Sequence, residues 1–203
     1  MKRFGWITAL VLVCTVNAVA QPTETLVVPP YPADVAWKQI MDKKNSFMRQ
    51  IEWIPADQTE SDIRDILTQQ NFNLKTMPAT LFTAGMLQSL SKACEGLRVN
   101  GPTSKTENGY SVAYAQAYCT GQKGAGKDVD IFLKAIQGKE GLYVVQREFR
   151  RPAEPGAVPG VRSFSGNQAA LADQALESQA TAAKYLSQVQ LCPTPEPCAV
   201  PAQ

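Results

Sequence analysis

The stretch that decides the fold is residues 108–149, NGYSVAYAQAYCTGQKGAGKDVDIFLKAIQGKEGLYVVQREF. It holds three apolar runs, Gly109 to Cys119, Val129 to Ile136 and Gly141 to Phe149, separated by short segments rich in turn formers. In the first run the tyrosines share one phase of a two-residue period, which is typical of a β-strand. Three strands of similar length joined by short loops predict an antiparallel meander.

Upstream of this meander, two apolar stretches flank a cluster of turn formers at residues 42–45. The second stretch alternates apolar and polar positions around Ile51, which favours a strand, and the pair fits a hairpin. The first stretch, which begins at Trp37, fits a helical turn equally well. Leu97 to Val99 is a candidate fourth strand of the meander.

Helices are expected both before and after the meander along the chain. Thr59 or Ser61 caps a short predicted helix that contains Ile63, Ile66 and Leu67. A clearer helix begins at Pro78 and ends at Cys94, because apolar residues recur in it at helical spacing. Near the C-terminus, an Ala/Gln-rich stretch without internal proline or glycine has a composition that favours a helix.

These elements define a fold class and an organisation of the chain. The predicted class is α+β, an antiparallel meander sheet with helices on one face, plus a C-terminal Ala/Gln-rich helix. Burial of alanine contributes little per residue, so we expect residues 153–203 to be separable from the core and free to meet a partner. The expected segments are a signal peptide at 1–20, an extended lead-in at 21–34, an α+β domain at 35–152, a Pro/Gly linker at 153–165, a C-terminal helix at 166–191 and a Pro-rich tail at 192–203.

The N-terminus has the pattern of a cleavable export signal. Lys2 and Arg3 precede an apolar run, and the small residues at 18–20 predict cleavage before Gln21. The apolar run is shorter than the roughly 20 residues that span a bilayer, so no stable membrane span is expected. Cys14 leaves lipoprotein processing as an alternative. The protein is therefore expected to be periplasmic or secreted.

Four cysteines follow the signal segment, and an even number in an exported chain predicts two disulfide bonds. Four cysteines allow three pairings, and the sequence alone does not select one. We favour Cys94 with Cys119, which border one predicted core, and Cys192 with Cys198, which flank a Pro-rich loop. Zinc ligation is the alternative, but the chain has no Cys-x-x-Cys pair and no histidine.

The composition excludes several kinds of chemistry. The absence of histidine removes Ser–His–Asp and Cys–His catalysis and most transition-metal sites. No dinucleotide or phosphate-loop motif is present, so no cofactor is expected, and no small-molecule ligand is identified. Removal of residues 1–20 takes away two of the 20 basic residues, and the remaining 18 match the 18 acidic ones. A neutral mature chain gives no reason to expect a nucleic-acid partner.

Three arginines are the sharpest positive feature of the sequence that points to a ligand. Arg147, Arg150 and Arg151 lie at the end of the last predicted strand, where guanidinium groups can bind carboxylate or phosphate through paired hydrogen bonds. They are candidates for anion or partner contact. The alternative is a charged strand end that prevents pairing with other chains.

Three segments, at residues 65–72, 108–119 and 134–150, resemble an uncharacterised family of exported proteobacterial proteins. The resemblance covers roughly residues 47–152 and omits the Ala/Gln-rich stretch. None of the three segments is a catalytic motif. The resemblance implies an exported single domain, and it identifies no functional residue.

The expected function is that of a non-enzymatic periplasmic binding or assembly protein, such as an accessory factor of an envelope or secretion machine. Its partner would be another envelope protein. One alternative is a carboxylate-dependent hydrolase that acts on cell-wall or glycan substrates. However, the acidic residues at 52–65 have the spacing of a solvated capping segment. A third alternative is an inhibitor or immunity protein against a secreted toxin.

We predict that the mature protein begins at Gln21, because the residues before it match the small-residue rule of signal peptidase. The intact mass of the exported protein, measured by mass spectrometry, checks this. A species that retains residues 1–20, or one lipidated at Cys14, would contradict the prediction.

Overall fold

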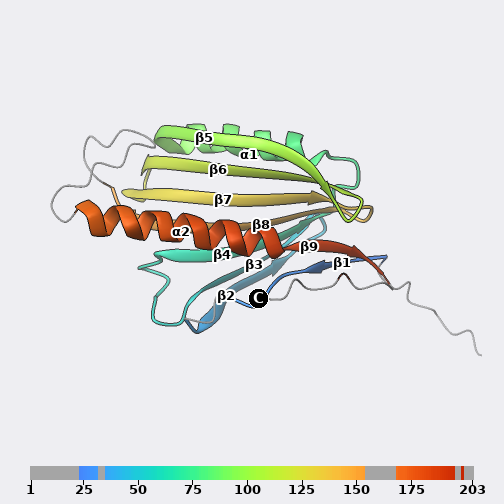
Figure 1. Ribbon diagram of the computed structural model, residues 1–203, viewed down its shortest axis with the longest axis horizontal. Helices are drawn as coiled ribbons and strands as arrows, with labels where there is room; N and C mark the ends of the chain where they lie inside the picture. The colour runs from blue at the N-terminus through green and yellow to red at the C-terminus, as the bar shows by residue number, and fades with distance from the viewer. Residues whose placement is uncertain (1–22, 32–34, 154–167, 195–197, 199–203) are drawn as a thin grey trace, which may run out of the picture.

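Seven strands form one antiparallel sheet in the order β2-β3-β4-β8-β7-β6-β5, and β1 pairs with β9 in a separate two-stranded sheet (Figure 1). The structure is a computed structural model that describes residues 23–31, 35–153, 168–194 and 198. The elements are β1 (Glu24–Val27), β2 (Trp37–Lys44), β3 (Met48–Pro55), β4 (Asp65–Phe72), α1 (Ala79–Ala93), β5 (Cys94–Glu107), β6 (Tyr110–Gln122), β7 (Lys127–Gln137), β8 (Leu142–Pro152), α2 (Gln168–Gln188) and β9 (Gln190–Pro193).

The α+β class with an antiparallel sheet is confirmed, and the sheet consists of two meanders. Within β5 to β8, and likewise within β2 to β4, strands that are consecutive along the chain pair with each other. The two meanders join where β4 pairs antiparallel with β8. The predicted hairpin of β2 and β3 is present, and the Asn45 side chain accepts hydrogen bonds from two amides of its turn. Helix α1 connects β4 in the middle of the sheet with β5 at its edge.

The short helix expected around residues 63–67 is wrong, because this segment enters strand β4. Ile66 and Leu67 are adjacent in sequence and both are buried. Neighbouring side chains of a strand point to opposite faces, so β4 carries apolar residues on both faces at this point. Such a strand has no alternating pattern, and its apolar residues imitate a helical stripe.

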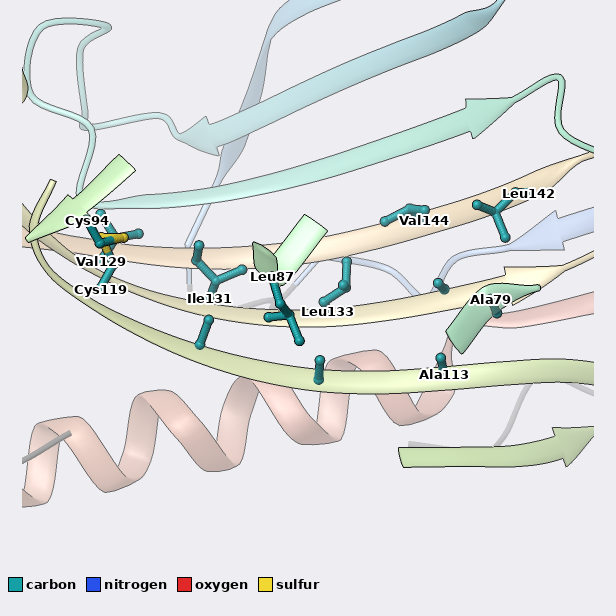
Figure 2. Close-up of a cluster of buried hydrophobic side chains, with 13 residues drawn as sticks. Ala79, Leu87, Cys94, Ala113, Cys119, Val129, Ile131, Leu133, Leu142 and Val144 are labelled. Atoms are coloured by element: carbon teal, nitrogen blue, oxygen red, sulfur yellow. A yellow bond between two sulfur atoms is a disulfide. The ribbon is translucent and has the colours of Figure 1, made fainter. Parts of the chain in front are cut away.

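Helix α1 packs on one face of the sheet and covers the core cluster on that face. Its residues Ala79 and Leu87 meet small side chains of β6 and larger ones of β7, among them Ile131 and Leu133 (Figure 2). The bond between Cys94 and Cys119 lies at one end of this cluster, where α1 passes into β5. The favoured pairing of the cysteines is confirmed, since the second bond joins Cys192 and Cys198.

Helix α2 lies on the opposite face of the sheet, over β7 and β8 (Figure 1). Its buried residues Tyr185 and Leu186 belong to the same cluster as Phe132 and Ile136 of β7. The expectation that the C-terminal segment is separable from the core is therefore wrong, as far as its described residues show, because α2 covers the second face of the sheet. The physical reason is that β7 carries large apolar side chains on both faces, so each face needs a covering layer.

The N-terminal strand β1 is anchored by a buried carboxylate. Glu24 accepts hydrogen bonds from the amides of Lys139 and Glu140, each at 2.8 Å, and from the hydroxyl of Tyr143 at 3.1 Å. A Cβ atom on Gly138 would overlap this carboxylate, so the turn between β7 and β8 requires glycine there. Because β1 pairs with β9, the same contacts hold the strand that follows α2.

We predict that Leu186→Ala lowers the free energy of unfolding by about 2–4 kcal/mol, because the side chain is 3% exposed and its removal leaves a cavity. Leu176 lies on the same helix and is 65% exposed. Leu176→Ala is the matched control and should change stability by about 0.5 kcal/mol or less. Urea denaturation of both variants checks this. Equal stability of the two would mean that α2 contributes nothing to the core.

Candidate functional site

Helix α1 covers only part of its face of the sheet, because it packs on β5, β6 and β7 (Figure 1). Side chains alternate along each strand, and the register of β3, β4 and β8 therefore brings six polar residues to the part of this face beside α1. They are Gln50 and Glu52 of β3, Thr68 and Gln70 of β4, and Gln146 and Glu148 of β8. We call these six residues the polar floor.

One side of α1 faces the polar floor. Phe82, Met86 and Leu90 follow each other at intervals of four residues, so they form one stripe along the helix, and each is half-buried. We call this stripe the apolar wall. A pocket lies between the wall and the sheet, lined by Met86, Leu87, Leu90, Ala115, Ala117, Ile131, Leu133, Gln146 and Glu148. We call the surface that the wall and the floor form together the groove. The pocket lies on its β8 side, beside Gln146 and Glu148.

A chain of hydrogen bonds runs across the floor from β4 to β3. The amide of Gln70 donates to the side-chain oxygen of Gln50 at 2.8 Å, and the amide of Gln50 donates to Glu52 at 2.5 Å. The side-chain oxygen of Gln70 is buried and accepts no hydrogen bond from the part of the chain that the structure describes. Among the described residues, Glu52 forms no ion pair.

The carboxylate on the β8 side of the floor, Glu148, accepts hydrogen bonds at both of its oxygens. Glu148 accepts a hydrogen bond from the amide of Gln146 at 3.0 Å, and its second oxygen accepts two from Arg150, at 2.8 and 3.1 Å. The floor therefore has two carboxylates with different surroundings. One is paired with a cation, and the other is not.

Aromatic side chains line one end of the groove. The ring of Phe72 lies 5.8 Å from that of Phe47 and 4.9 Å from that of Phe82, measured between centroids. Phe47 is 51% exposed and Leu81, next to Phe82 on α1, is 60% exposed. Large apolar side chains at such exposure, grouped on one edge of a groove, are typical of a binding surface.

The three arginines predicted to contact an anion or partner do not form one site. Alternation along β8 places Arg147 and Arg151 on the face of α2, and only Arg150 on the face of the groove. Arg147 donates two hydrogen bonds to Asp65, at 2.6 and 3.0 Å, and Arg151 donates two to Asp130, at 2.9 and 3.3 Å. Each arginine thus binds a carboxylate of the protein itself, and contact with an external anion stays a prediction.

Lys134 is the most deeply buried charged side chain of the described residues, with 0% exposure. Its ammonium group donates to Glu107 at 2.6 Å and to the carbonyl of Val189, and it lies 5.0 Å from the ring centre of Tyr114. Burial lowers the pKa of Lys134, and the hydrogen bond with Glu107 opposes that effect. Since Val189 follows α2, this contact holds the end of the helix on the sheet. We assign it to folding rather than to ligand binding.

Burial raises the pKa of Glu107, but hydrogen bonds from Lys105, Lys134 and Tyr114 outweigh it, so the net pKa lies below its ordinary value. Burial of the ring, and next the same carboxylate, raise the pKa of Tyr114. This cluster therefore keeps Glu107 ionised and Tyr114 protonated. Both states suit a fixed hydrogen-bond network.

No group of three Cys, Asp or Glu side chains suited to a metal ion occurs within the residues that the structure describes. Neither α1 nor the described part of α2 is long and apolar enough to cross a membrane. A comparison with models of known protein families finds no match, and a comparison with curated proteins finds none either. The groove is thus the feature on which a functional proposal rests.

The sequence did not reveal this groove. Its floor contains glutamines, which carry no motif, and they meet only through the pairing of β4 with β8 and β3. The one available signal was the run of polar residues at 68–71 inside an otherwise apolar segment.

We predict that Glu107→Ala lowers the free energy of unfolding by about 3 kcal/mol, because it leaves the Lys134 ammonium group buried without a counter-charge. Lys134→Met removes that charge together with its desolvation and should cost about 1 kcal/mol or less. Urea denaturation measures both. Lys105→Met, at an exposed lysine that also pairs with Glu107, is the control and should be nearly neutral. A larger loss for Lys134→Met than for Glu107→Ala would contradict this assignment.

Proposed function

We propose that the protein is a non-enzymatic binding protein of the periplasm or the cell exterior, and that the groove between α1 and the polar floor holds a segment of another envelope protein. The observation that supports this most is the combination of the apolar wall with a polar floor that is only partly satisfied. Binding sites typically combine apolar walls with a few placed polar groups. An accessory role in an envelope or secretion machine fits this proposal.

The disulfide bonds support the proposed compartment. Two bonded cysteine pairs are compatible with an extracellular or periplasmic location, since such bonds persist in oxidising environments. In this proposal the Ala/Gln-rich C-terminal helix is not the arm that meets the partner. It supports the sheet from the face opposite to the groove.

The hydrolase alternative would use the two carboxylates of the floor. The register places Glu52 on β3 and Glu148 on β8, with β4 between them and a stagger of two residues. Standard strand spacings put their Cα atoms about 12 Å apart. The two side chains would have to lean toward each other across β4 to bring their carboxyl groups to the separation of about 5 to 9.5 Å that glycosidases use. Because Glu148 also binds Arg150, we favour the binding role. The inhibitor or immunity alternative belongs to the same binding class, with a toxin as the partner.

We predict that a diazirine amino acid at Met86, irradiated in the native envelope, forms one discrete covalent adduct with a partner protein. The same amino acid at Leu176, on the opposite face of the sheet, is the matched control and should form none. Leu90→Glu, which places a charge in the apolar wall, should abolish the adduct, and its melting curve shows that the variant is folded at the temperature of the experiment. Equal labelling from both positions, or an adduct that persists in Leu90→Glu, would contradict a partner site in the groove.

A further inference from the structure

The pocket beside α1 exists because the side chains beneath the helix are small. Ala115 and Ala117 of β6 are buried, and they leave a space that Leu87 of α1 and Ile131 and Leu133 of β7 surround but do not fill (Figure 2). The volume of this space is about 90 Å³. Protein interiors are normally close-packed, so a ligand group that enters the pocket gains contacts that the chain itself does not make there.

The volume of the pocket limits the size of its occupant. An apolar cavity of about 150 Å³ holds benzene, which has six carbon atoms. In proportion, a volume of about 90 Å³ holds about four carbon atoms. The side chains of leucine and isoleucine have four carbons each, whereas that of phenylalanine has seven. The pocket therefore fits an aliphatic side chain and is too small for an aromatic one.

The rim of the pocket is polar, but its carboxylate is already neutralised. Glu148 lines the pocket, and its two oxygens accept hydrogen bonds from Gln146 and from Arg150. The guanidinium group of Arg150 lies 2.8 Å from this carboxylate. A charged occupant would have to separate this ion pair and leave one of its members without a counter-charge. The rim thus favours an occupant that is neutral.

One acceptor at the rim is open to a ligand. The side-chain amide of Gln146 donates to Glu148, while its oxygen accepts no hydrogen bond from the described residues. In contrast to the oxygen of Gln70, that of Gln146 is not cut off from the surface. A backbone N–H is a neutral donor that every residue except proline carries. The methyl end of a lipid acyl chain has no such donor, so the rim favours a polypeptide over a lipid.

We propose that this pocket is the anchor site of the groove, which holds the side chain of one leucine or isoleucine of the partner segment while a backbone N–H beside that residue donates to Gln146. This inference rests on the proposed function, because it names the residue by which the partner segment is held. Binding interfaces commonly place a buried aliphatic anchor in a pocket and surround it with polar groups.

The test uses the full-length mature protein with isotope-labelled leucine methyl groups and the blocked peptides acetyl-Gly-Ser-X-Ser-Gly-amide. With leucine or isoleucine as X, titration followed by NMR should shift the methyl signals of Leu87, Leu90 and Leu133, which line the pocket. Leu186, on the opposite face of the sheet, should not shift. The Kd should be about tenfold lower with leucine than with alanine, because more apolar surface is buried. Phenylalanine should bind no better than alanine.

N-methylated peptides test the hydrogen bond to Gln146. Methylation of the leucine nitrogen, or of the nitrogen of the serine after it, removes one backbone N–H. One of these two changes should raise the Kd about fivefold. Gln146→Met replaces the acceptor by an apolar side chain of similar length. In this variant the methylated and unmethylated peptides should therefore bind equally.

A variant that fills the pocket gives a readout that a purely structural role would not produce. Ala117→Val adds two methyl groups inside the pocket, and it should abolish binding of the leucine peptide without lowering the melting temperature. Ala113→Val is the matched control, on the same face of β6 and buried, but not at the pocket. It should lower the melting temperature through overpacking and leave the Kd, measured below the unfolding transition, unchanged.

Several results would overturn the inference. They are the absence of shifts with every peptide, a preference for phenylalanine, a Kd that Ala117→Val does not change, and an effect of N-methylation that persists in Gln146→Met. Tighter binding of octanoate or of free leucine than of the leucine peptide would also overturn it, and would assign the pocket to an acyl chain or to an amino acid.

The cross-link at Met86 keeps these outcomes separate from the proposed function. If the leucine peptide fails to bind and the Met86 adduct forms, the groove still has a partner, and only the leucine anchor is wrong. If the adduct is absent from the native envelope, the proposed function is contradicted even when the peptide binds.

Discussion

The structure depends on strand β7, which is buried on both faces. Ile131 and Leu133 point toward α1, and Phe132 and Ile136 point toward α2, so neither helix alone could cover the strand. Because of this requirement, the C-terminal segment crosses the sheet, and β9 lies beside β1. The requirement also sets the position of the groove. Helix α1 packs where the side chains of β6 are small, over β5 to β7, and leaves the floor beside it uncovered.

The charged side chains on the two faces of the sheet differ in how they are paired. On the face of α2, Lys134 binds Glu107, Arg147 binds Asp65 and Arg151 binds Asp130, so buried charges occur in pairs. Such pairs meet the requirement that a buried charge have a counter-charge, and they add little net stability. Among the described residues, buried polar atoms without a partner occur on both faces, Oε1 of Gln70 beside the groove and Nη1 of Arg147 on the face of α2, whereas Glu52 forms no ion pair.

Much of the fold could be predicted from local patterns. The strands β6, β7 and β8, the hairpin of β2 and β3, the helix after Pro78 and the pairing of the cysteines agree with the structure. The failures share one cause. Where apolar residues face both sides, as at Ile66 and Leu67 in β4, the period of the pattern no longer distinguishes a strand from a helix. The packing of α2 on the sheet was likewise not predicted. Its apolar stripe is thin, and a few residues such as Leu186 make the contact.

The sequence by itself determined the elements that short-range physics controls: strands from alternating side chains and turn formers, α1 from helical spacing, and disulfide bonds from an even count of cysteines in a chain that is expected to be exported. Only the tertiary structure decided which strands became neighbours and which face each helix covered. The polar floor exists because β4 pairs with β8, although helix α1 and strands β5 to β7 separate them along the chain. Pairing over such a distance depends on the packing of both faces of the sheet together, and no local pattern records it.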